Sequence, residues 1–177
     1  PEAGARMQEM MGLTYLAMSE KASAQKQLHG ALEKRQQVLG GEHPDTLRSM
    51  RQLAVVFQEQ GRHAEAEVLL RQTLHKQQRV LGPEHPDTCV TITVLAAVCE
   101  AQDKPCDSEM MLRQLWKLQK RVLGPDHLET LATVGHLGSL LVRQGRHAEA
   151  IEMRHEHLNA ARRVHGARHP QTVVSMT

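Results

Sequence analysis

A ten-residue motif occurs four times in this sequence, and its copies are evenly spaced. They begin at Val38, Val80, Val122 and Val164, each 42 residues after the one before. The first reads Val-Leu-Gly-Gly-Glu-His-Pro-Asp-Thr-Leu, and the second differs from it only by Pro for the second Gly and Cys for the last Leu. A fixed period of this length is typical of repeat proteins, in which each unit packs against its neighbours. The chain is therefore predicted to be an array of tandem repeats.

A second motif lies between the copies of the first. Residues 60–67 read Gln-Gly-Arg-His-Ala-Glu-Ala-Glu, return almost unchanged at 144–151, and have a degraded copy at 102–109. Two boundaries in each period predict two helices in each period, joined by turns too short for anything but an antiparallel hairpin. The predicted helices cover residues 5–18, 21–39, 44–60, 63–81, 86–102, 105–123, 127–144 and 147–165, and a ninth begins at Pro170.

The residues around the predicted helices agree with these boundaries. Between Pro44 and Gly61, apolar residues such as Leu47 and Leu53 recur every three or four positions, which places them on one helical face. Proline suits a first helical position, and glycine at the end tolerates the left-handed conformation that closes a helix. We accordingly predict that each repeat is a pair of amphipathic helices.

Composition supports an all-helical chain and gives little information about partners. Apolar residues make up 40% and aromatic residues only 2%, and the net charge of +2 does not favour nucleic acid or an anionic membrane. The longest apolar run, Val94–Cys99, is too short to cross a bilayer. Three cysteines without metal-type spacing indicate reduced thiols. We therefore expect a cytoplasmic protein that binds neither membrane nor nucleic acid.

Small residues recur where two helices of a hairpin would touch. In first helices they are Gly12, Ala54, Ala96 and Gly138, and in second helices Ala24, Ala66, Ser108 and Ala150. This pattern resembles the tetratricopeptide repeat family, and specifically its 42-residue kinesin light chain type. The resemblance covers essentially the whole chain and implies an all-α, right-handed α-solenoid. The expected repeats span about 1–42, 43–84, 85–126 and 127–168, with a partial fifth over 169–177, cut from a longer protein.

Catalytic and metal-binding chemistry are not indicated. Four of the twelve histidines repeat one turn position, namely His43, His85, His127 and His169, and a solenoid keeps such residues one repeat apart. We expect them to be capping or solvated side chains and not metal ligands. No nucleophile lies in a recognisable setting, and no glycine-rich loop could hold a phosphate. The sequence predicts neither an enzyme nor a cofactor.

The resemblance implies instead a protein-interaction scaffold that binds a peptide in the concave groove lined by first helices. We expect acidic and apolar ligand residues to meet an arginine pair and a neighbouring apolar patch. The predicted ligand-binding residues are Arg48, Arg51, Gln52, Val55, Thr93, Val94, Ala97, His136, Ser139 and Arg143.

Other interpretations remain open at this stage. A basic ridge could form where the second helices end, from Lys34, Arg35, Lys76, Arg79, Lys120, Arg121, Arg162 and Arg163. Exposed apolar ends could mediate self-association. The array could also be a sensor or spacer in an NB-ARC-type NTPase receptor, or a regulatory domain fused to an enzyme.

Overall fold

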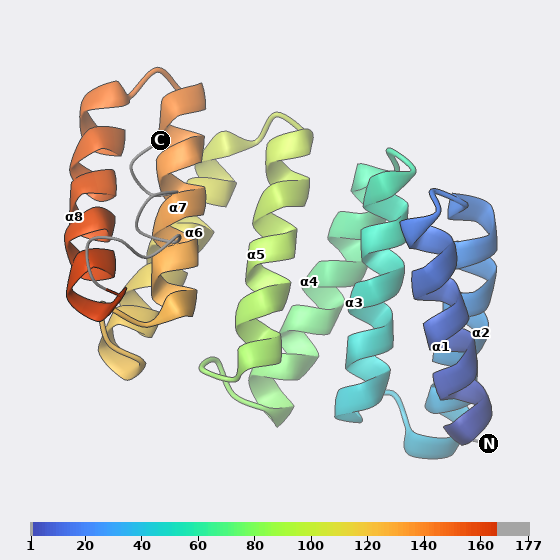
Figure 1. The fold of residues 1–177 in the computed structure, drawn as a ribbon. Coiled ribbons are helices and arrows are strands. Elements are labelled where there is room, and N and C mark those ends of the chain that lie inside the picture. The colour runs from blue at the N-terminus through green and yellow to red at the C-terminus, as the bar shows by residue number, and fades with distance from the viewer. Residues whose placement is uncertain (1, 166–177) are drawn as a thin grey trace. The chain divides into compact units, whose positions relative to one another are not determined.

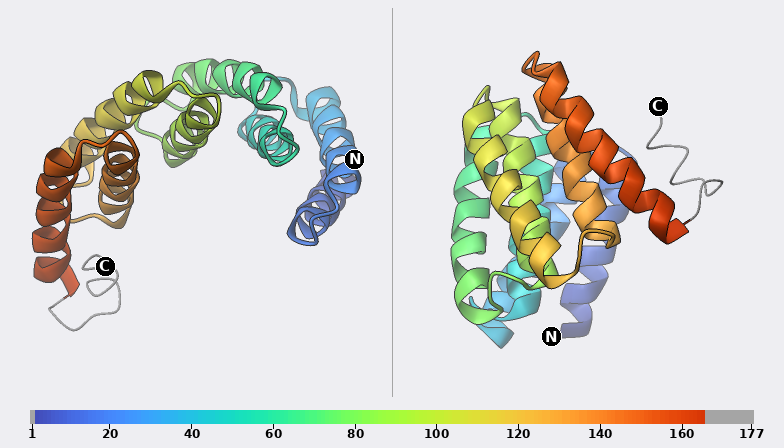
Figure 2. Two further views of the ribbon diagram at one scale, coloured as in Figure 1. Left: turned by 90° about the horizontal axis from the view of Figure 1, so that it is seen from above. Right: turned by 90° about the vertical axis from the view of Figure 1, so that its left-hand side faces the viewer.

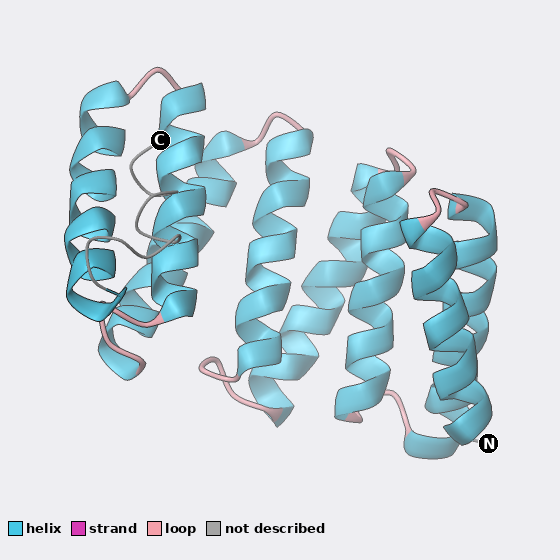
Figure 3. Cartoon of the chain, in the orientation of Figure 1, coloured by secondary structure: helices cyan, strands magenta, loops and turns pink. Residues whose placement is uncertain are grey.

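The computed structural model describes residues 2–165, which form eight helices and no strand (Figures 1 and 3). This confirms the predicted all-α solenoid of helical hairpins. The largest boundary error is at the first helix, which starts at Glu2 and not near residue 5. The predicted ninth helix lies outside the described residues. The helices are α1 (Glu2–Ala17), α2 (Lys21–Leu39), α3 (Pro44–Glu59), α4 (His63–Val80), α5 (Pro86–Ala101), α6 (Pro105–Val122), α7 (Leu128–Arg143) and α8 (His147–His165).

The chain divides into two compact units, residues 1–103 and 104–177. In the first unit, α2 packs against α1 and α3, and α4 packs against α3 and α5. Helices α1, α3 and α5 therefore make one layer, and α2 and α4 make the other (Figure 2). We call these the A layer and the B layer. In the second unit α7 packs against both α6 and α8.

The core of the first unit lies between its two layers. Leu28 of α2 and Leu47 of α3 are fully buried, as is Val56. Leu112 and Leu137 have the same role in the second unit. The small residues predicted at helix contacts are all buried: Gly12, Ala24, Ala54, Ala66, Ala96, Ser108, Gly138 and Ala150.

The repeated histidines cap the first helices of their repeats. Nδ1 of His43, His85 and His127 accepts a hydrogen bond from the backbone N–H two residues later, at 3.2, 3.2 and 3.3 Å. One of the N–H groups that the first turn leaves unpaired is thereby satisfied. This confirms the interpretation of these histidines as caps.

The hairpin turns need a residue with positive φ. Glycine supplies it at Gly61 (φ 77°) and Gly145 (φ 75°), as the second motif predicts. In the first and third hairpins the position is occupied by Ser19 (φ 61°) and Asp103 (φ 60°). A side chain in this conformation strains the backbone, although aspartate tolerates it better than most residues.

Candidate functional site

Seven of the ten predicted ligand-binding residues lie on α3 and α5, which contact each other in the A layer. The structure thus brings these seven together in the first unit. They are Arg48, Arg51, Gln52 and Val55 on α3, and Thr93, Val94 and Ala97 on α5.

Arg51 connects the two helices. Its Nη1 donates to Oδ1 of Asp87 at 3.0 Å and to the carbonyl oxygen of Asp87 at 3.1 Å. The Arg51 side chain is only 14% exposed. Asp87 lies in the first turn of α5, where a carboxylate also complements the helix dipole. The acidic group that Arg51 was expected to find in a ligand is therefore already present in the chain itself.

Arg48 is the more accessible arginine of the pair. Its side chain is 43% exposed and lies 3.3 Å from Oδ1 of Asp45 and 4.0 Å from Oδ2 of Asp87. These exposed contacts are weak compared with the Arg51 bond, because solvent screens them. Arg48 is the residue of the two that keeps a cation accessible on the A layer.

The remaining A-layer residues of the first unit form a mixed surface. Ala97 is exposed, whereas Val55 and Val94 are half-buried. The Thr93 hydroxyl donates to the carbonyl oxygen of Cys89 at 3.2 Å. Oε1 of Gln52 is shielded from solvent and has no hydrogen-bond partner in the described chain.

The other three predicted ligand-binding residues belong to the second unit. His136, Ser139 and Arg143 lie on α7, and all three are exposed. The Ser139 hydroxyl donates to the carbonyl oxygen of Gly135 at 3.0 Å.

The alternative basic ridge includes one residue that the prediction placed wrongly. Arg35 is 3% exposed, and it donates to Glu9 and to the Ser49 hydroxyl at 2.5 Å each. It cannot belong to a solvated ridge, because it ties α2 to α1 and α3. Arg79 pairs with Glu42. The side chains of Arg162 and Arg163 lie outside the described part of the chain.

The second motif forms a polar cluster at the hairpin turn of the second repeat. Arg62 donates to both carboxylate oxygens of Glu65 at 2.7 and 2.6 Å, and to Gln60 at 3.0 Å. It also donates to Gln25 of the preceding second helix at 3.2 Å, and its guanidinium lies 4.3 Å from the centre of the Phe57 ring. The hydrogen bonds from Arg62 lower the pKa of Glu65 against a smaller opposing effect of burial. The cluster ties the hairpin turn to the preceding repeat.

An equivalent cluster occurs 84 residues later (146 − 62) in the second unit. Arg146 donates to Gln144 at 3.0 Å, to Glu149 at 2.6 Å and to Glu109 of the preceding second helix at 2.6 Å. Glu109 also accepts from Arg113 at 2.7 Å. Burial raises the pKa of Glu109, but the hydrogen bonds from both arginines outweigh it and the pKa is lowered. From the sequence, this motif predicted only the positions of turns. Its recurrence at Gln60 and Gln144 was the feature that could have indicated a repeated polar cluster at these turns.

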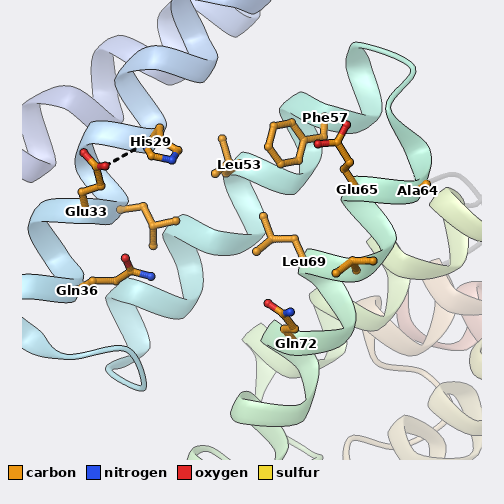
Figure 4. Close-up of a pocket in the computed structure, with 11 residues that line it drawn as sticks. His29, Glu33, Gln36, Leu53, Phe57, Ala64, Glu65, Leu69 and Gln72 are labelled. Carbon is orange, nitrogen blue, oxygen red and sulfur yellow. Dashed lines mark ion pairs between the residues drawn. The ribbon is translucent and has the colours of Figure 1, made fainter.

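A trough lies between α2 and α4 on the B layer of the first unit (Figure 4). Its volume is about 630 Å³, and its floor comes from α3. Leu53 and Phe57 of α3 line it, together with Leu32 of α2 and Leu69 of α4. The sequence predicted only the alternative basic ridge at the ends of the second helices on this layer, and no apolar trough.

Three further observations on the described residues concern metal binding, membrane spanning and the cysteines. No group of three or more His, Cys, Asp or Glu side chains there could hold a metal ion. None of the described helices has the length and apolar character needed to cross a membrane. Cys89 and Cys99 are buried. A cytoplasmic location stays a prediction.

Comparisons with known proteins agree with the helical architecture. The family model described as tetratricopeptide repeat matches residues 5–75 and 130–177. No curated protein matches the chain.

Solved structures give the same result. A kinesin light chain-like protein of Podosopora anserina with nearly identical TPR-like repeats is 25% identical, with a TM-score of 0.85 over 96% of this chain and 80% of that one. BtubC (BKLC) from P. vanneervenii is 17% identical, with a TM-score of 0.82 over 99% of this chain and 71% of its own. A Rap conjugation gene regulator of the plasmid pLS20, solved with the Phr* peptide, is 14% identical, with a TM-score of 0.73 over 92% of this chain and 43% of its own.

Proposed function

The chain belongs to the tetratricopeptide repeat family and is of the kinesin light chain-like type, and on that premise we propose that it is a non-catalytic scaffold that binds a peptide segment of another protein along its A layer. The observation that carries this proposal is the surface of α3 and α5, where exposed Ala97 and half-buried Val55 and Val94 lie on the same two helices as Arg48. An extended or helical segment could place apolar side chains on this surface.

The fold itself is suited to such a partner. A protein with this fold was solved with the Phr* peptide, although its identity of 14% transfers the fold and no individual contact. On the present chain, Arg48 favours an acidic residue in the ligand, while Arg51 is held by Asp87 and acts by positioning α5. We therefore assign the electrostatic part of recognition to Arg48 and treat Arg51 as structural.

The proposal is tested with variants on exposed positions, so that folding is preserved. Peptides selected from a random display library on the full chain are synthesised, and their affinity is measured by fluorescence anisotropy. Arg48→Glu and Ala97→Asp should each weaken binding by about fivefold, the factor expected from loss of ~1 kcal/mol. Higher salt should weaken it further, because the Arg48 contribution is screened.

The control is a charge change on the competing surface. Arg79→Glu with Arg121→Glu alters the ends of second helices and should leave the affinity unchanged, and circular dichroism verifies that every variant is helical. If only this second pair weakens binding, the A-layer assignment is wrong and the basic ridge is the site. The receptor-array and enzyme-regulatory alternatives stay predictions.

A further inference from the structure

The trough between α2 and α4 has features of a binding site that are independent of the A layer. Its volume, about 630 Å³, is within the range of pockets that hold ligands. Leu53 is almost fully buried at the floor, while Val68 at the edge is 58% exposed. An apolar surface that is partly open to water gains free energy when a partner covers it.

The rim of the trough carries a specific charge. Glu33 of α2 is 60% exposed and lies 3.5 Å from Nδ1 of His29, a contact that is an ion pair only when the imidazole is protonated (Figure 4). Glu65 on the opposite rim is already held by Nε and Nη2 of the Arg62 side chain. Glu33 is therefore the carboxylate on the rim that is available to a cation of a partner.

These features do not follow from the repeat pattern. One period later, His75 replaces Glu33, Cys99 replaces Phe57, and Arg71 replaces His29. The sequence at the next pair of second helices therefore lacks both the aromatic residue and the acidic residue. If the trough were only a by-product of the repeat, the same residue types would line it in each repeat. Instead, the combination of Glu33 with Phe57 occurs once among the four repeats.

We propose that this trough binds an amphipathic helix of a partner protein, with apolar side chains at positions i, i+3 or i+4, and i+7 and a lysine or arginine beside them. The lining residues run from His29 to Gln36 on α2 and from Ala64 to Gln72 on α4. Nine residues of helix span about 13 Å, which matches two to three turns of a bound helix. The apolar side chains would cover Phe57, Val68 and Leu69, and the cation would meet Glu33.

The experiment uses a phage-displayed library of 16-residue peptides in a helix-favouring frame, with the apolar and flanking positions randomised. Selection on the full chain is carried out with the soluble Val68→Asp chain as competitor, so that peptides independent of the trough are removed. The enriched peptides should show apolar residues at helical spacing and an excess of lysine and arginine. The strongest is synthesised with a fluorophore, and its Kd is measured by anisotropy.

Two trough variants and two matched controls give the decisive comparison. Glu33→Lys and Val68→Asp should each raise the Kd by at least about fivefold, because each removes an exposed contact worth roughly 1 kcal/mol. The controls, Met110→Asp and Glu152→Lys, make the same chemical changes at exposed positions of the second unit, and Met110 is 56% exposed at the position equivalent to Val68. They should leave the Kd unchanged.

A charge exchange strengthens the test. A peptide in which the lysine is replaced by glutamate should bind the Glu33→Lys chain better than the original chain. The proposal is overturned if no peptide is enriched over the competitor, or if the controls weaken binding as much as the trough variants. It is also overturned if the selected peptides lose binding only with Arg48→Glu and Ala97→Asp, a result that would support the A-layer proposal instead.

Discussion

Replacing Gly12 by alanine should destabilise the first hairpin, although alanine is the better helix former. Gly12 lies in the middle of α1 and is buried against α2. A Cβ atom at Gly12 would lie 2.6 Å from Cγ and 2.9 Å from Cδ2 of Leu28, and 3.3 Å from the Leu28 backbone nitrogen. Leu28 is itself fully buried, so its side chain has no free space to enter. The two helices must separate to admit the methyl group.

The sign of the effect follows from two opposing magnitudes. The intrinsic preference for alanine over glycine in a helix favours Gly12→Ala by about 1 kcal/mol. Overpacking a well-packed contact costs about 1–3 kcal/mol, and here the backbone of α2 contributes to the clash. We expect a net loss of about 1 kcal/mol, concentrated in α1 and α2 because repeats are stabilised by nearest-neighbour contacts.

Gly138 provides a matched control in the equivalent position of the fourth repeat. A Cβ atom there would meet only Cγ of Arg154, at the ordinary contact distance of 3.8 Å. Gly138→Ala should therefore stabilise the chain by about 0.5–1 kcal/mol. Hydrogen exchange of each hairpin and urea unfolding followed by circular dichroism measure both effects. If Gly12→Ala stabilises α1 and α2 to the same extent that Gly138→Ala stabilises α7, the prediction is wrong. In that case the close contact between Gly12 and Leu28 does not limit the packing of this hairpin.

Three further predictions concern helix ends and the second polar cluster. His85→Ala should cost about 0.5–2 kcal/mol in urea unfolding, because Nδ1 accepts from the N–H of Asp87, whereas His85→Asn should retain most of the stability. Asp103→Gly should raise the unfolding midpoint by relieving a side chain at φ 60°, and an unchanged or lower midpoint would contradict this. Because the folded-state pKa of Glu109 is lowered from 4.5, its bonds to Arg146 stabilise the fold above that pH and are lost as pH falls through the lower folded-state value. Glu109→Gln should therefore make stability less sensitive to acid, and equal sensitivity in both chains would refute the assignment.

Much of the architecture could be predicted because the determinants are local. Pro44 and Pro86 open helices and Gly61 closes a hairpin through their own backbone preferences, whatever the neighbouring repeats contain. The 42-residue period then transfers each boundary to the other repeats. The boundary errors were small where such markers exist and largest at the start of α1.

The errors in the predicted surfaces arose from contacts between residues distant in sequence. Arg35 lies in a pattern of cations near the end of a helix, but it follows Leu28 and Leu32 of the buried face by seven and three residues, whereas its neighbour Lys34 is solvated. Its burial depends on Glu9, 26 residues earlier, and Ser49, 14 residues later. Arg51 likewise finds Asp87 across 36 residues. Periodicity identifies a helical face, but it does not show which charge the adjacent repeat places there.

The repeats themselves separate structural from functional positions. Residues that recur in register, such as His43 with His85 and Arg62 with Arg146, form the same caps and turn clusters each time, so their recurrence is explained by packing. A binding site that distinguishes one partner must depend on positions that differ between repeats. Glu33 becomes His75 and then Lys117 at the same helical position. Because this position is exposed, the change from anion to cation does not disturb the fold. It does change which partner charge the adjacent surface can accept.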